Sequence, residues 1–446
     1  MFGLGQSENT IANAFMKRQD HPSSVWAATA NVRPELPALK EDIETDVAIV
    51  GGGFSGLSTA HHLRQAGIAC IILEANDVGW GASGRNGGMA VLRYKSAYSS
   101  IAAAHGDEVA LLLYRLVREA VDTLESIVAE YGIDCDFRRC GHITAANGRK
   151  AIQTLEADIR WLSQQADDTA PSLLDGGQMR DLVGTDIYPG GYLDPRSAGI
   201  HPLNYAHGFA AGLAANGVPI FVGCPVTGLQ SNAGGVTLQT PRGTVRAKRV
   251  VMTTNAYTDL ARLGLDLAQR VVPVSTSVIA TAPLPDKIAN TVLPQRQLVT
   301  DTRNLVNYFR VLPDKRILFG GRGDITGYES REIYQGLERL LVETFPALAG
   351  IPIQFRWSGK VAVTLDDFPH FGRVNDRIFY AMGYGGRGVA LTNLLGKLVA
   401  RLVQGTEVNA GPMNQNRFAP IPFHGGRIPV MQMVAGWYKL LDCLER

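Results

Sequence analysis

Two short, mostly apolar stretches flank a segment of helical periodicity in the N-terminal part of the chain. Residues 45–50 (TDVAIV) and 68–74 (IACIILE) are rich in β-branched side chains, and residues 57–67 between them repeat apolar positions with the period of a helix. Strands that are apolar along most of their length, without alternation, are typical of parallel strands buried on both faces. The pattern predicts a strand–helix–strand unit built on a parallel sheet.

Helical and strand-like segments alternate along the rest of the chain, without internal repeats. The polar, proline-containing residues 1–44 predict an irregular leader. Helical periods occur in residues 106–131, 201–216, 329–344 and 389–405, and strand patterns occur in residues 235–255, 270–320 and 377–383. Strand–helix units therefore lie at the start, in the middle and near the end of the chain. This order predicts two interleaved domains rather than two consecutive ones.

The turn after the first apolar stretch carries a glycine-rich fingerprint, GGGFSG (51–56). In a strand–turn–helix unit, Gly51 permits the tight turn, Gly53 lets a pyrophosphate approach the backbone, and Gly56 allows close packing of helix on strand. The helix N-terminus offers free N–H groups to phosphate oxygens. Glu74 ends the second stretch, where a carboxylate accepts hydrogen bonds from ribose hydroxyls. These features together predict a dinucleotide site.

The composition is that of a globular protein with small-molecule ligands. Lys and Arg (43) nearly balance Asp and Glu (41), which argues against nucleic acid as a partner. The five cysteines are scattered without the spacing of a metal site, so we expect no metal and a cytoplasmic location. No apolar run reaches the length of a transmembrane helix. Residues 428–441 (IPVMQMVAGWYKLL) are apolar enough to leave peripheral contact with the inner membrane open.

The segment after Glu74, NDVGWGASGRNGG (76–88), distinguishes FAD from NAD. It resembles the loop with which flavoproteins of the D-amino-acid-oxidase/sarcosine-oxidase class wrap the FAD pyrophosphate and the flavin. CPVTGL (224–229) resembles the strand of this class that contacts adenine, which makes Val226 a candidate. Residues 357–374 and 379–396 resemble its C-terminal flavin-binding region.

That C-terminal region has the class pattern T-x-D-x-x-P at Thr364, Asp366 and Pro369, followed by a glycine-rich turn. A helix that begins near Gly388 would direct its positive end at the flavin and stabilise the reduced form. Besides the fingerprint glycines, Glu74 and Val226, the resemblance implies FAD contacts at Phe54, Ser55, Ala75, Gly81, Ala82, Ser83, Arg85, Asn86, Gly87, Gly88, Gly383, Gly385, Gly386, Arg387, Gly388 and Val389.

A narrower resemblance, to the family of gamma-glutamylputrescine oxidase, covers nearly the whole chain. It rests on SVWAATA (24–30), GASGRNGG (81–88), YGIDCDFR (131–138), HPLN (201–204), FRWSGKVAVTLDDFPHFGR (355–373) and PFHGGRIPV (422–430). The family implies that the flavin takes a hydride from the carbon next to an amine, that water hydrolyses the resulting imine, and that oxygen reoxidises the flavin.

Departures from related patterns refine this expectation. Some relatives attach FAD covalently through a Cys or a His in two segments that correspond to residues 359–363 and 83–88. Residues 359–363 contain no Cys and residues 83–88 contain no His, so we expect non-covalent FAD. Val361 stands where glycine-oxidase-like enzymes carry a carboxylate-binding Arg, and Ala390 where sarcosine-oxidase-like enzymes carry a Lys. Both departures disfavour a simple α-amino acid as substrate.

Six residues are candidates for substrate binding. Arg93 and Arg322 could bind a substrate carboxylate, although each could equally be a solvated surface charge. The aromatic residues Tyr257, Tyr308, Trp357 and Tyr384 lie in segments that this class uses to wall the substrate cavity, and each could instead be core. No general acid, base or nucleophile stands out, so the sequence names no catalytic residue.

The sequence thus predicts an α+β fold. A Rossmann-type FAD-binding domain, with a mixed or parallel sheet and a β-meander, would comprise residues 45–100, 196–262 and 355–446. An antiparallel-sheet substrate domain would comprise residues 101–195 and 263–354. We expect oxidation of an amine, with a γ-glutamylated amine as substrate or, alternatively, a cyclic secondary amino acid such as L-pipecolate. The sequence is compatible with oxygen or a quinone-linked compound as the electron acceptor. It is also compatible with a different class, an FAD-binding protein with a structural or tRNA-modifying role.

Overall fold

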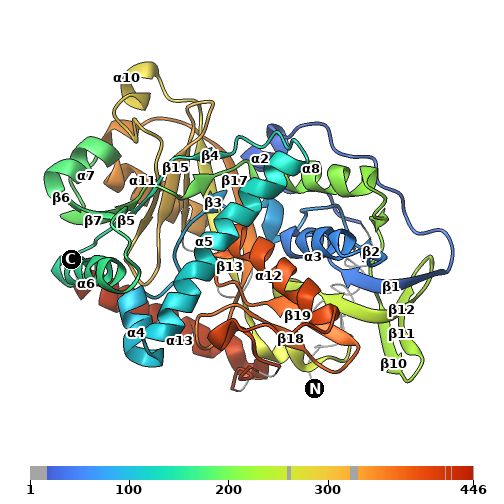
Figure 1. The fold of residues 1–446 in the computed structure, drawn as a ribbon. Coiled ribbons are helices and arrows are strands. Elements are labelled where there is room, and N and C mark those ends of the chain that lie inside the picture. The colour runs from blue at the N-terminus through green and yellow to red at the C-terminus, as the bar shows by residue number, and fades with distance from the viewer. Residues whose placement is uncertain (1–17, 259–262, 322–329, 417, 423, 445–446) are drawn as a thin grey trace, which may run out of the picture.

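The computed structural model describes residues 18–258, 263–321, 330–416, 418–422 and 424–444 of the chain. Two eight-stranded sheets and one three-stranded sheet form its framework (Figure 1). The three-stranded sheet joins β3 (Met89–Ala90), β8 (Ala198–Gly199) and β4 (Arg138–Arg139). The α+β architecture with several sheets confirms the predicted fold class.

The first large sheet has a parallel centre and a meander at one edge. Its strands follow the order β10 (Gly228–Asn232), β11 (Gly235–Thr240), β12 (Gly243–Met252), β1 (Ile43–Val50), β2 (Cys70–Leu73) and β9 (Ile220–Phe221). In addition, β19 (Ile378–Met382) pairs with β12, and β18 (His370–Arg373) pairs with β19. Strands β19, β12, β1, β2 and β9 run parallel, whereas β10, β11 and β12 are antiparallel.

The second half of strand β1 is buried on both faces, as its unbroken apolar pattern predicted. Val47 and Ile49 pack into the hydrophobic cluster formed with the neighbouring helices, and Ala48 and Val50 pack into the cluster on the opposite face. Successive side chains of a strand point to opposite faces, so an apolar residue at each of these four positions is what two buried faces require.

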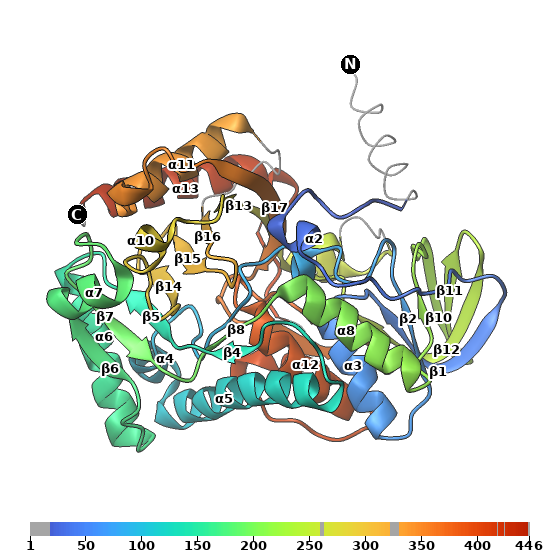
Figure 2. The same ribbon diagram turned by 90° about the horizontal axis from the view of Figure 1, so that it is seen from above.

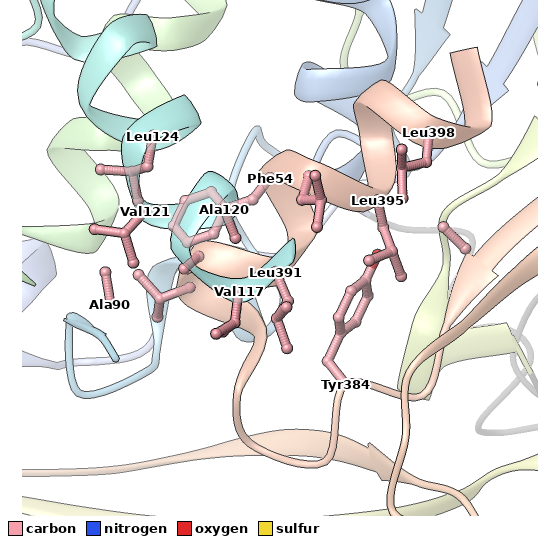
Figure 3. Packing of buried hydrophobic residues seen from close by; sticks show 14 of the residues in the cluster. Phe54, Ala90, Val117, Ala120, Val121, Leu124, Tyr384, Leu391, Leu395 and Leu398 are labelled. Atoms are coloured by element: carbon pink, nitrogen blue, oxygen red, sulfur yellow. The ribbon is translucent and has the colours of Figure 1, made fainter. Parts of the chain in front are cut away.

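A layer of helices covers the first face of this sheet (Figure 2). It contains α3 (Phe54–Gln65), α5 (Asp107–Glu130), α8 (Pro202–Ala215) and α12 (Gly388–Val403). α12 packs against both α3 and α5, and Val117 and Val121 of α5 lie close to Leu391 of α12 (Figure 3). This packing fixes the N-terminal end of α12, which is important for the site described below.

The second large sheet is mostly antiparallel. Its order is β17 (Ile353–Val363), β13 (Val272–Thr281), β16 (Ile317–Gly321), β15 (Tyr308–Val311), β14 (Leu298–Asp301), β5 (His142–Ala145), β7 (Gly190–Asp194) and β6 (Ser172–Asp175). Only the β14–β5 pair within this order is parallel. The boundary that we expected at residue 355 falls inside β17, which pairs with β13 along its length.

The remaining helices lie around these layers. They are α2 (Val25–Ala28), α4 (Tyr98–His105), α6 (Arg149–Gln165), α7 (Gly176–Val183), α10 (Asp286–Ala289), α11 (Arg331–Thr344) and α13 (Arg427–Leu444). Short 3₁₀ helices are η1 (Ala82–Gly84), η2 (Asn255–Tyr257), η3 (Asp266–Arg270), η4 (Pro346–Leu348), η5 (Gly411–Met413) and η6 (His424–Gly426).

Each of the expected helices is present, and the expectation for the leader was incomplete. The four helical periods correspond to α5, α8, α11 and α12. The leader, however, is not wholly irregular, because the Ser24 hydroxyl accepts a hydrogen bond from the N–H of Ala27 and caps α2. Within the described part of the chain, no helix is both long and apolar enough to cross a membrane.

Candidate active site

A cavity of ≈ 990 Å³ lies where the two large sheets meet. Val50 and Leu73, at the carboxyl ends of β1 and β2, line one part of it, and Val274 and Val361, on β13 and β17, line another. Helices α11 and α13 contribute further wall residues. A ligand at the carboxyl ends of parallel strands is the arrangement expected of a doubly wound sheet.

The fingerprint turn is shaped by steric limits that only glycine meets. Gly51 has φ +115°, a conformation that side chains disfavour. A Cβ on Gly56 would lie 2.0 Å from the carbonyl oxygen of Gly51, so α3 could not approach β1 as closely as it does. Gly53 forms the N-cap of α3 and lines the cavity. The first turn of α3 therefore presents its N–H groups to the cavity.

The Glu74 carboxylate is held at the end of β2 by backbone groups. One oxygen accepts a hydrogen bond from the N–H of Gly52 at 2.6 Å, and the other from the N–H of Asn76 at 2.8 Å. Burial raises the pKa of Glu74, and the two N–H groups oppose that effect. Glu74 lines the cavity, in the position predicted for binding a ribose.

The loop after β2 closes over the same region. The Ser83 hydroxyl accepts a hydrogen bond from the N–H of Phe54 at 3.0 Å, which ties the loop to the N-terminus of α3. The Nε of Arg85 donates to the carbonyl of Trp80 at 2.7 Å, and its guanidinium lies 4.3 Å from the centre of the Trp80 ring. These local contacts fix the loop against the N-terminus of α3.

Three residues that the sequence did not single out as supports hold this loop or the neighbouring fingerprint turn from behind. Trp26 of α2 donates to the carbonyl of Asn86 at 2.8 Å. Arg310, on β15, is buried and donates through Nη1 to the carbonyls of Gly88 at 2.7 Å and Ile200 at 3.0 Å. Thr253 donates to the carbonyl of Val50 at 2.9 Å, beside the fingerprint turn. An arginine within the apolar stretch NYFRVL was the one available signal for Arg310.

The second glycine-rich turn delivers the N-terminus of α12 to the cavity. Gly383, Gly385 and Gly386 have φ values of +83°, +53° and +85°. The N–H of Gly385 donates to the carbonyl of Ala362 at 2.9 Å, which fixes the turn to β17. Gly388 begins α12 and lines the cavity. The positive end of the helix macrodipole therefore faces the cavity.

These features suit FAD. Gly53 leaves a cradle beside Ser83 that a Cβ would fill, at 2.8 Å from the Ser83 hydroxyl oxygen. One end of the cavity has a buried carboxylate and Val226, the middle has the N-terminus of α3, and α12 supplies a second helix N-terminus. Together these groups match a ribose, a pyrophosphate and the polar edge of an isoalloxazine ring.

Most of the predicted FAD residues are brought together. Those that line the cavity are Gly51, Gly53, Phe54, Ser55, Glu74, Ala75, Gly81, Ala82, Ser83, Arg85, Asn86, Gly87, Val226, Gly385, Gly386, Arg387, Gly388 and Val389. Gly56, Gly88 and Gly383 are not part of this lining. They act from behind it, because a Cβ on each would meet a neighbouring atom at 2.0, 2.2 and 2.5 Å, respectively.

The substrate candidates divide into two groups. Tyr257, Tyr308 and Tyr384 line the cavity, and the hydroxyl of Tyr384 is 2.8 Å from that of Ser55. The structure places Trp357 elsewhere than we expected, in the core beside the loop, where its Nε1 donates to the carbonyl of Arg85 at 2.9 Å.

Of the two predicted carboxylate anchors, the structure describes only Arg93, and it lies outside the described cavity wall. Arg93 is buried in an ion pair, with Nη2 3.0 Å from Oδ2 of Asp158, and is not part of the described lining. No local pattern indicated this pair, because Asp158 lies on α6, far along the chain. Arg322 lies outside the described residues.

Comparisons with known proteins agree with this geometry. The profile of the DAO family, described as FAD dependent oxidoreductase, matches residues 46–402. Gamma-glutamylputrescine oxidoreductase of Escherichia coli is 36% identical over 95% of this chain and 99% of its own length. The probable oxidoreductase OrdL of Haemophilus influenzae is 30% identical over 95% of this chain and 98% of its own length.

Among solved structures, glycine oxidase from Geobacillus kaustophilus has a TM-score of 0.72 at 24% identity. The structural match covers 84% of this chain and 99% of the glycine oxidase chain. The fold, the cavity and the similarity over nearly the full length lead to one conclusion: the chain belongs to the DAO family of FAD-dependent oxidoreductases.

Proposed function

We propose that this enzyme oxidises a γ-glutamylated amine at the carbon next to the amine and that oxygen is the electron acceptor, with hydrogen peroxide as a product. The observation that carries the proposal is the similarity to a gamma-glutamylputrescine oxidoreductase over 95% of this chain. FAD, when bound, supplies the acceptor for a hydride from the substrate carbon. Water then hydrolyses the imine to an aldehyde.

The walls of the cavity support an elongated substrate. Beyond the residues that would hold FAD, the cavity extends past Tyr308 to α11 and α13. Val361 lines the cavity and Ala390 is buried in α12, so neither position offers the cation with which related amino acid oxidases bind a carboxylate. These features favour a longer amine over glycine or sarcosine.

The protein's own groups position the reactants. The N-terminus of α12 directs its N–H groups at the cavity, where they stabilise negative charge that develops during hydride transfer. Tyr257 and Tyr308 wall the cavity between the loop and the second sheet, and both are partly buried. Hydride transfer depends on how closely the C–H bond is positioned, so rigid walls contribute more than a proton-transfer group.

A peroxide assay with a matched substrate panel tests the proposal. The panel contains γ-glutamylputrescine, putrescine, L-pipecolate, sarcosine and glycine, and the Gly53→Val variant, which we expect not to retain FAD, serves as the control. We expect the largest kcat/KM for γ-glutamylputrescine, with peroxide formed in step with substrate loss. A higher kcat/KM for L-pipecolate would instead favour the cyclic amino acid. Rapid turnover with a quinone analogue but none with oxygen would refute the oxidase assignment.

A further inference from the structure

Arg387 is a cation in the cavity wall, and no anion of the described residues forms an ion pair with it. The residue is the N-cap of α12, and its backbone N–H donates to the carbonyl of Tyr384 at 2.8 Å. Its side chain lines the cavity, and among the described residues no carboxylate pairs with its guanidinium. Burial lowers the pKa of Arg387 to about 10, and repulsion from Arg93 adds to the effect. The group therefore remains positively charged at neutral pH.

Two other cations of the same wall have partners. Lys95 pairs with Asp367, with an N–O distance of 2.8 Å. Arg85 donates to the carbonyl of Trp80 and stacks on its ring. Arg387 differs from both: it is partly buried, and no ion pair among the described residues offsets the cost of shielding its charge from water, a cost that an anionic ligand would compensate.

Arg93 adds a second positive charge next to Arg387. Its Nη2 lies 3.0 Å from Oδ2 of Asp158, and its guanidinium carbon lies 4.6 Å from the centre of the Tyr192 ring. The Nη1 of Arg93 is buried and has no acceptor among the described residues. Two guanidinium groups and one carboxylate leave this group with a net charge of +1, together with an unused hydrogen-bond donor.

His142 and Thr300 complete this region without cancelling its charge. The Nε2 of His142 lies 2.9 Å from the hydroxyl of Thr300, and Thr300 lines the cavity. Burial, together with repulsion from Arg387 and Arg93, holds the pKa of His142 well below its ordinary value, so the ring is neutral. The four residues Arg387, Arg93, His142 and Thr300 are called the Arg387 subsite below.

We infer that the Arg387 subsite binds a carboxylate of the substrate, with Arg387 as the direct partner. A planar guanidinium with free donors suits a carboxylate, because it can form two parallel hydrogen bonds. Arg93 is a positioning residue, which acts by keeping the local charge positive while Asp158 holds it in place. The inference rests on the proposed function, in which the substrate carries a carboxylate on its glutamyl group. Arg387 thereby takes the place of Arg93 and Arg322 as the expected direct anchor of the carboxylate.

The test compares substrates and variants that differ in one group each. Wild-type holoenzyme, Arg387→Met, Arg387→Lys and the control Arg401→Met are assayed with γ-glutamylputrescine and with its α-amide, which lacks only the carboxylate. Arg401 is an exposed arginine at the opposite end of α12. In a separate experiment, binding of L-glutamate is followed by the change that it causes in the flavin absorbance, a readout that needs no turnover. Flavin content and the free flavin spectrum are recorded for every variant.

We expect Arg387→Met to raise KM for γ-glutamylputrescine at least ~30-fold, as for the loss of a buried charge pair. Its KM for the α-amide should be unchanged, and Arg387→Lys should recover part of the loss. L-Glutamate should bind the wild type and Arg401→Met but not Arg387→Met. A loss confined to KM places the carboxylate far from the reacting carbon, whereas an equal loss in kcat places it nearby.

Three results would overturn the inference. One is an equal effect of Arg387→Met on both substrates. Another is lost flavin or a changed flavin spectrum with KM unaltered, which would assign Arg387 to the cofactor. A third is a wild type that does not bind L-glutamate. Absence of turnover with every amine, with L-glutamate binding still dependent on Arg387, would instead refute the proposed function and leave the subsite intact.

Discussion

Replacing Gly53 by alanine should separate cofactor binding from folding. Gly53 has φ −84° and ψ 179°, which alanine adopts without strain. Its added Cβ would meet only the Ser83 hydroxyl oxygen, at 2.8 Å, and the Ser83 Cβ, at 3.8 Å. The hydroxyl is the end of a side chain that can rotate away, so the fold should tolerate the change. The FAD pyrophosphate, by contrast, must pass through the space that the Cβ occupies.

The magnitudes differ enough to be measured separately. Alanine is a poorer N-cap than glycine, and we expect a loss of about 1 kcal/mol or less in the free energy of unfolding of the FAD-free protein. A displaced pyrophosphate loses at least two charge-assisted hydrogen bonds from the N-terminus of α3, each of which contributes about 1.5 kcal/mol or more. The sum corresponds to a rise of roughly 100-fold in the FAD dissociation constant.

The assay is a fluorescence titration of FAD-free protein with FAD, paired with thermal unfolding of the same samples. Gly177→Ala provides the matched control, because Gly177 also lies at the start of a helix, α7, and has only the Asp175 side chain nearby, at 3.3 Å. Adding Ser83→Ala to Gly53→Ala removes the hydroxyl that the new Cβ would meet, but this double variant should not recover FAD affinity. If Gly53→Ala binds FAD as tightly as the wild type, the pyrophosphate does not lie against Gly53, and the placement of the cofactor is wrong.

Three further predictions concern the flavin and the response to acid. Acid precipitation should leave the flavin in the supernatant, because the attachment positions lack Cys and His; colour in the pellet would reveal a covalent link. If the N-terminus of α12 faces the flavin, sulfite should add readily and the reduced flavin should be anionic, whereas a neutral, unreactive flavin would place that helix end elsewhere. Burial lowers the pKa values of His201 and His207 to about 4, from 6.5 in the unfolded chain. Unfolding therefore takes up protons, so the free energy of unfolding should fall as pH drops from 6.5 towards 4, by up to roughly 3 kcal/mol per histidine. Urea titrations of His201→Gln and His207→Gln should show that this free energy depends less steeply on pH. The same dependence as in the wild type would contradict the prediction.

The cofactor half of the site was accessible from the sequence because its parts are local. A strand, a tight turn and a helix N-terminus that follow one another in the chain must also be neighbours in space. Gly51, Gly53 and Glu74 could therefore be assigned from spacing, and the structure places all three in the cavity wall. The second glycine-rich turn was recognisable for the same reason, since Gly383 to Gly388 lead directly into α12.

The substrate half depends on contacts between distant segments, which no local pattern records. Arg93 stood in a suitable stretch, but its partner Asp158 comes from α6 and holds it in an ion pair outside the described cavity wall. Trp357 has its indole N–H bound to the loop instead of facing the cavity. Arg387 was noticed only for its place in a glycine-rich turn. Its lack of an anion among the described residues is visible only once the surrounding elements are assembled.

The most direct test of the account is anaerobic mixing of the FAD-containing enzyme with γ-glutamylputrescine while the visible absorbance of the flavin is followed. Oxidation of the amine requires that the flavin band bleach in proportion to the substrate consumed, that an aldehyde appear in equal amount, and that admission of oxygen restore the band. A flavin that is bound but keeps its colour with γ-glutamylputrescine and with every other amine in the panel would contradict amine oxidation by this protein.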